Sequence, residues 1–165
     1  MIRSIISILL LPVILSGCYA YRVFPKSYRH FEAPAATQTV YIINPELKKE
    51  FEILKAAGIY IISNDSTNHL AIKLYPMQRN FVCGQPIVGS ILFLGQLPAY
   101  LPDRYQFIYE EQQDGTTRQF KYELKVATRI WFWDMFTFQK NFKKFAGKAL
   151  AGSRHQEKLV AHQQP

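Results

Sequence analysis

No apolar run in this 165-residue sequence is long enough to cross a lipid bilayer. The longest, from Ile5 to Leu15, holds about a dozen residues, whereas a spanning helix needs roughly 20. A permanent transmembrane helix is therefore not expected. Because the run follows a short segment with one positive charge, Arg3, it has the pattern of a secretory signal peptide.

Cysteine is scarce, and one of the two cysteines directly follows this run, in Leu15-Ser16-Gly17-Cys18. The four residues resemble the lipobox of bacterial lipoproteins, in which the cysteine thiol accepts a lipid. The resemblance implies that the signal peptide, residues 1–17, is removed. Cys18 then carries diacylglycerol on its sulfur and usually a third acyl chain on its amine, which together anchor a protein stably. The alternatives are cleavage after Ala20, giving a soluble periplasmic protein, and a cytosolic chain with a buried first helix.

Lipidation of Cys18 leaves Cys83 as the remaining thiol, so no intramolecular disulfide is expected. Cys83 lies in the apolar stretch "NFVCGQP" and is interpreted as a buried inert thiol, with intermolecular pairing as the alternative. Tyr19 occupies the position where an aspartate would retain such a lipoprotein in the inner membrane. By the same resemblance, the outer membrane, with the domain facing the periplasm, is the expected location.

The sequence also lacks the motifs of common enzyme classes: it has no G-x-S-x-G, HExxH, P-loop or Rossmann fingerprint. Glu110 and Glu111 are neighbours on a predicted strand, so their side chains point to opposite faces and cannot act as an acid–base pair. We expect no catalytic residue, no metal and no cofactor. The four histidines show no metal-ligand spacing: His30, His69, His155 and His162.

Acidic residues are too few to balance the bases, and the net charge is +8. From Met135 onward, six basic residues accompany a single acid, Glu157, so this part carries a net charge of +5. The expected counter-charges are anionic lipid, lipopolysaccharide phosphate or peptidoglycan. Nucleic acid is not an expected partner, because an exported lipoprotein rarely meets any.

The sequence predicts one α+β domain over residues 39–150, with an antiparallel or mixed sheet and two helices. A proline-containing tether, residues 18–38, precedes it, and a polar, disordered tail, residues 151–165, follows it. The domain opens with the order strand, helix, strand, strand: residues 40–43, 45–57, 59–62 and 70–74. Asn44 is the expected N-cap of the helix and Gly58 its C-terminal stop.

Asp114-Gly115 is the turn pair of a type I′ β-hairpin, with alternating apolar residues on both sides. A two-residue turn fixes the register, so Tyr109 should face Phe120, and Tyr105 should face Leu124. Residues 81–103 are rich in Gly, Pro and apolar residues, and we interpret them as a loop or short broken helix packed on the sheet.

The last predicted element is an amphipathic helix in residues 131–150. One face is apolar and mostly aromatic: Trp131, Met135, Phe138, Phe142, Phe145 and Ala149. The other face carries lysines that are candidates for binding an anionic surface: Lys140, Lys143, Lys144 and Lys148. This helix either packs its aromatic face on the sheet or lies in a membrane interface.

The run "CGQPIVGSILFLGQLPAYLPDRYQFIYE" is similar to segments of small uncharacterised proteobacterial outer-membrane lipoproteins. The order of elements also looks like the domains of accessory lipoproteins in curli secretion and in activation of penicillin-binding proteins. These resemblances imply a non-catalytic binding or scaffolding role, with another envelope protein, anionic lipid or peptidoglycan as partner. The alternatives are a hydrolase of cell-envelope material and a carrier of a hydrophobic ligand.

Overall fold

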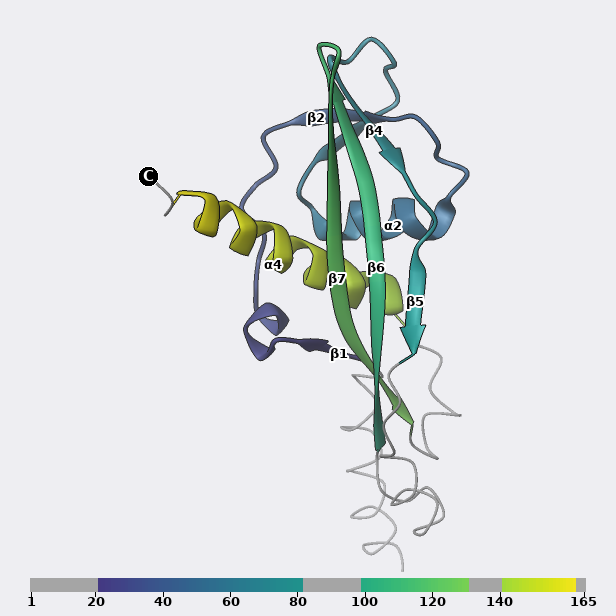
Figure 1. Cartoon of the computed structure of the whole chain (residues 1–165), viewed down its shortest axis with the longest axis vertical. Helices are drawn as coiled ribbons and strands as arrows, with labels where there is room; N and C mark the ends of the chain where they lie inside the picture. The colour runs from purple at the N-terminus through teal and green to yellow at the C-terminus, as the bar shows by residue number, and fades with distance from the viewer. Residues whose placement is uncertain (1–20, 82–98, 131–140, 163–165) are drawn as a thin grey trace, which may run out of the picture.

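The computed structural model describes residues 21–81, 99–130 and 141–162 (Figure 1). Within these ranges the chain is α+β, as predicted, with a mixed sheet of seven strands in the order β1-β7-β6-β4-β2-β3, and β5 beside β6. The strands are β1 (Tyr21–Phe24), β2 (Thr39–Ile42), β3 (Ile61–Ser63), β4 (Leu70–Leu74), β5 (Gln78–Phe81), β6 (Ala99–Gln113) and β7 (Thr116–Ile130). The helices are η1 (Lys26–Arg29, a 3-10 helix), α2 (Lys48–Ala57) and α4 (Phe142–His162).

The β6–β7 hairpin forms the long axis of the molecule (Figure 1). Asp114 and Gly115 both have positive φ, 49° and 78°, as a type I′ turn requires. The predicted register is confirmed, because Tyr109 pairs with Phe120 and Tyr105 with Leu124. Each strand has 15 residues, so the hairpin is about 50 Å long at roughly 3.3 Å per residue.

One face of this hairpin is buried beneath α2 and α4. Its buried residues include Phe107, Tyr109 and Leu124, each fully inaccessible. The rings of Tyr109 and Phe120 stack across the two strands, with centroids 5.3 Å apart. The helices therefore cover the face that the alternation pattern marks as apolar.

Strands β2, β3 and β4 make the sheet mixed, because β2 pairs in parallel with both β3 and β4. Helix α2 ends at Gly58, which adopts a left-handed φ of 65°, as predicted. The predicted N-cap is wrong: α2 begins at Lys48, with Leu47 at the N-cap position. Asn44 instead extends the sheet, since its side chain donates to Leu74 O and accepts from Leu74 N, both at 2.8 Å.

The predicted tether, residues 18–38, contains structure that the sequence pattern does not indicate. Tyr21–Phe24 form β1, which pairs antiparallel with β7, and Val23 is completely buried. A four-residue strand of this kind has no periodicity of its own and is stabilised by its neighbour in the sheet. The folded domain therefore includes Tyr21–Phe24, which the sequence pattern assigns to the tether.

The prediction of a disordered tail from residue 151 is also wrong, because α4 continues to His162. Ala151 is 4% exposed, and Gly152 marks a close contact rather than a helix end. A Cβ at Gly152 would lie 2.5 Å from Cγ of Tyr28, so only glycine admits that ring. The residues beyond Gly152 are mostly polar, so the sequence pattern does not indicate this contact.

Several predicted features lie outside the described residues: the signal peptide and Cys18, residues 82–98 of the predicted apolar loop with Cys83, and Trp131, Met135, Phe138 and Lys140 of the expected last helix. In the described part, that helix begins at Phe142. The loop prediction for residues 81–103 is wrong at both ends, because Phe81 ends β5 and residues 99–103 begin β6, where Phe81 pairs with Asp103. None of the described helices combines the length and the apolar character needed to cross a membrane.

Candidate binding site

A buried arginine, Arg154 of α4, lies at the centre of the polar interior and is 8% exposed. Its Nη2 donates to Oε1 of Glu111 on β6 at 2.7 Å, and its Nη1 donates to the hydroxyl of Tyr109. Tyr60, just before β3, donates its hydroxyl to the same Glu111 oxygen and lies 3.2 Å from the Tyr109 hydroxyl. The positive charge of Arg154 is therefore compensated inside a network that joins α4 to the sheet.

Aromatic rings enclose the same guanidinium. Its central carbon lies 4.6 Å from the ring centroid of Phe120, 5.1 Å from that of Tyr60 and 5.7 Å from that of Tyr109. Contacts of this kind between a cation and a ring face are favourable and strengthen when water is excluded. They also hold the planar guanidinium in one orientation.

Burial raises the pKa of Tyr60 and Tyr109 far above that of an exposed tyrosine, so both remain neutral. Burial alone would lower the pKa of Arg154, but the nearby oxygens of Tyr109, Tyr60 and Glu111 outweigh it and raise that pKa. At neutral pH the two phenols are therefore neutral hydrogen-bonding groups beside the Arg154 cation.

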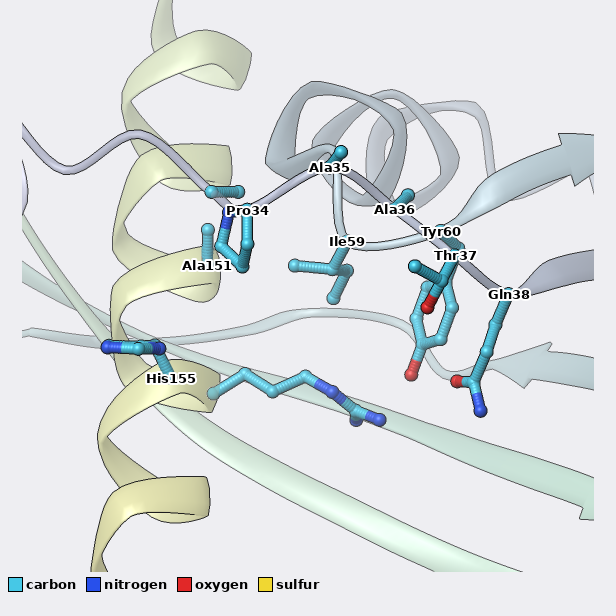
Figure 2. A pocket seen from close by; sticks show the side chains of 11 residues that line it. Pro34, Ala35, Ala36, Thr37, Gln38, Ile59, Tyr60, Ala151 and His155 are labelled. Carbon is cyan, nitrogen blue, oxygen red and sulfur yellow. The ribbon is translucent and has the colours of Figure 1, made fainter.

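Arg154 also lines a pocket of about 320 Å³ on the surface between α4 and the chain that leads into β2 (Figure 2). In Figure 2, Ala35 and Ala36 lead toward Thr37 and Gln38 on one side, while Ala151 and His155 project from α4 on the other. The walls are small apolar side chains with a few polar groups. The lining residues are Ala33, Pro34, Ala35, Ala36, Thr37, Gln38, Ile59, Tyr60, Ala151, Arg154 and His155.

Two kinds of hydrogen-bonding group remain available at this pocket. Within the described ranges, Nε of Arg154 has no hydrogen-bond partner, yet no fully buried side-chain nitrogen or oxygen there is unsatisfied, so Nε keeps access to solvent. Residues 33–37 belong to no helix or strand and make no hydrogen bond within the described part of the chain, and from Pro34 to Gln38 the backbone runs across the pocket without turning back (Figure 2). The next residue, Gln38, accepts from Ile61 N at 2.9 Å.

The pocket lining holds a hydroxyl, on Thr37, and an imidazole, on His155. A nucleophile needs a base within hydrogen-bonding distance, but Thr37 and His155 lie at opposite ends of the opening (Figure 2). The ring of His155 packs beside Phe31, with centroids 5.0 Å apart. A volume near 300 Å³ is at the lower limit for drug-sized ligands, which fits one or two side chains better than a lipid chain.

The predicted surface lysines do not form one group. Lys143 and Lys144 are exposed at the start of α4. Lys148 is half-buried and donates its Nζ to Arg29 O at 3.0 Å, so it fastens α4 to η1. Lys140 lies outside the described residues, and the sequence alone could not distinguish the structural lysine from the exposed ones.

The central residue of the site, Arg154, is not among the residues that the sequence pattern predicts to be functional. Arg154 lies in the segment predicted to be disordered, and the hairpin register places Arg118, not Arg154, opposite Glu111. That register is confirmed, but the carboxylate of Glu111 binds Arg154. The one available signal is the helical spacing of Ala146, Leu150 and Arg154, which continues the buried face of α4.

The described residues contain no group of three or more histidines, cysteines or acids that could hold a metal ion. No protein-family model matches the chain. No curated protein matches it. The solved structure of a minor lipoprotein from Acinetobacter baumannii is similar to it at 13% sequence identity, covering 78% of this chain and 91% of that chain, with a TM-score of 0.30.

Proposed function

We propose that this chain is a bacterial lipoprotein, anchored through Cys18 in the outer membrane, whose periplasmic domain has a non-catalytic binding role. The lipobox-like residues Leu15 to Cys18 support the anchor. Because β1 begins at Tyr21, three residues beyond Cys18, the lipid would hold the domain directly at the membrane without a long tether.

The observation that carries the binding role is the pocket beside an extended, unpaired backbone. Residues 33–37 offer free backbone groups, as a strand edge does, and Nε of Arg154 offers a donor beneath them. An extended peptide can pair with such a backbone and place a side chain in the adjacent pocket. We therefore propose that the partner is an extended segment of another envelope protein.

Replacement of Cys18 by alanine tests the anchor. The lipid-accepting thiol is lost, so the variant should take up no labelled fatty acid and should accumulate as the unprocessed precursor. The matched control is Cys83→Ala, which should be labelled and processed normally. Normal labelling of the Cys18→Ala protein would contradict the proposal.

Photo-crosslinking in intact envelopes tests the partner. A photoreactive residue at exposed Ala35, beside the pocket, should give a discrete adduct with another protein, while the same residue at exposed Lys121 on the opposite face should not. Successive amides of an extended strand point to opposite edges, so either Ala36→Pro or Thr37→Pro should remove an amide that faces the partner and abolish the adduct. Thr37→Val keeps the amide and should retain it.

Two results would contradict the peptide-binding proposal: the same adduct from Lys121, or an adduct that persists in both proline variants. Circular dichroism of each variant shows whether the domain is still folded. Neither proline removes a hydrogen bond within the described fold, because the amides of Ala36 and Thr37 make none there.

A further inference from the structure

The first described strand fixes the end of the molecule at which the chain leaves toward its N-terminus. Tyr21 pairs with Thr128, two residues before the end of β7, and Thr128 in turn pairs with Leu101 near the start of β6. This end of the hairpin is opposite to the Asp114-Gly115 turn (Figure 1). Three residues of fully extended chain span at most about 11 Å, so a lipid on Cys18 would hold this end of the sheet at the bilayer.

The length of the hairpin then sets the distance of the turn from that end. Residues 116–128 of β7 span about 40 Å at roughly 3.3 Å per residue. Electrostatic interactions at physiological salt are screened over about 8 Å. Only charges near the Tyr21 end can therefore interact appreciably with head groups when the hairpin stands away from the membrane.

Exposed basic residues lie at the Tyr21 end, and we name three of them the anchor-end cations: Arg22, Lys143 and Lys144. Arg22 follows Tyr21 in β1, and its guanidinium carbon lies 3.7 Å from the ring centroid of Tyr100. The two lysines are placed by their neighbours on α4, because the Tyr21 ring packs on Phe142 at 5.6 Å and on Phe145 at 6.2 Å.

The described structure gives the anchor-end cations no acidic partner, which distinguishes them from Arg79 and Arg104. Arg79 pairs with Asp103 at 2.8 Å, and Arg104 pairs with Glu123 at 3.4 Å. Lys148 donates to the backbone of η1. The charge left free at this end is therefore positive on both sides of the sheet, since Arg22 lies on the open face and the lysines lie on the helix-covered face.

We infer that the anchor-end cations bind anionic phospholipid head groups and so orient the domain, with the hairpin turn directed away from the membrane. The inference rests on the proposed lipidation, which supplies the orientation. A lipid three residues from β1 keeps Arg22 at the surface at high effective concentration. Each basic residue held close to an anionic membrane strengthens binding by about fivefold.

The test uses the mature chain, residues 18–165, with Cys18→Ser so that no lipid contributes, and phosphatidylcholine vesicles with a rising fraction of phosphatidylglycerol. The chain should float with the anionic vesicles at low salt and be released at high salt. The triple variant Arg22→Gln, Lys143→Gln and Lys144→Gln should bind up to about a hundredfold more weakly. The matched control is Lys73→Gln, Arg118→Gln and Lys121→Gln, which removes the same charge from exposed positions nearer the turn and should change binding less than about threefold.

Equal loss in the two triple variants would overturn the inference, because binding would then follow net charge alone. Failure of the parent chain to bind anionic vesicles at low salt would overturn it as well. Because this chain carries no lipid, neither outcome depends on Cys18 processing. The fatty-acid labelling experiment can therefore contradict lipidation of Cys18 while the vesicle experiment still supports head-group binding. The opposite combination of results is equally possible.

Discussion

Replacement of Arg154 by methionine should lower the free energy of unfolding by about 3–5 kcal/mol, the range for breaking a buried ion pair by removing one partner. The Glu111 side chain is only 15% exposed, and Arg154 is its ionic partner. Methionine fills the space but leaves the Glu111 carboxylate without a compensating charge. Urea denaturation followed by far-UV circular dichroism measures the loss.

A double variant distinguishes loss of the charge pair from loss of packing. Arg154→Met with Glu111→Leu removes both charges, and replacing a buried ion pair by apolar residues is often neutral or stabilising. We expect the double variant to recover most of the stability that the single variant loses. If the double variant is as unstable as Arg154→Met, packing around the guanidinium, rather than its charge, would be the source of the stability.

Replacement of Gly147 by leucine should lower the free energy of unfolding by about 3 kcal/mol, because it forces α4 away from α2. A Cβ at Gly147 would lie 2.7 Å from the carbonyl carbon of Ala56 and 2.8 Å from the backbone nitrogen of Ala57. Both atoms belong to the backbone of α2, so no side-chain rotation can relieve the clash. In an exposed helix, replacing a glycine would raise the free energy of unfolding by about 1 kcal/mol. At Gly147 the close contact with α2 makes the same replacement destabilising.

The control for Gly147→Leu is Lys144→Leu, one turn earlier on the exposed side of α4. It adds the same side chain to the same helix without a neighbour to displace, and should change stability by less than about 0.5 kcal/mol. Similar melting temperatures for the two leucine variants would show that α4 and α2 do not depend on the close contact at Gly147.

Local chemistry explains which parts of the fold the sequence predicts. The Asp114-Gly115 turn, the alternation on both sides and the resulting register are encoded in neighbouring residues, and the structure confirms all three. The left-handed stop of α2 at Gly58 is local in the same sense. Each of these features depends on backbone preferences that act over a few residues.

The features that the sequence analysis missed depend on distant partners. Strand β1 forms because it pairs with β7, which is distant in the sequence. Asn44 does not cap α2, because its side chain hydrogen-bonds the backbone of Leu74 in the neighbouring strand. The end of α4 looks polar in the sequence, but Arg154 is buried because Glu111 and three aromatic rings surround it. No window along the chain contains both members of any of these pairs, so the candidate site could not be predicted from the sequence.

If the chain is exported as the proposed lipoprotein, the pairing of β1 with β7 would also set the order of events during export. Tyr21 and Thr128 are neighbours in the sheet but are separated by more than a hundred residues of chain. A polypeptide that crosses the membrane with its N-terminus first cannot complete this pairing until β7 has also crossed. Until then the residues after Cys18 remain outside the sheet, within reach of the enzymes that would modify and cleave the leader. Pairing of β1 with β7 would then make this segment inaccessible to those enzymes.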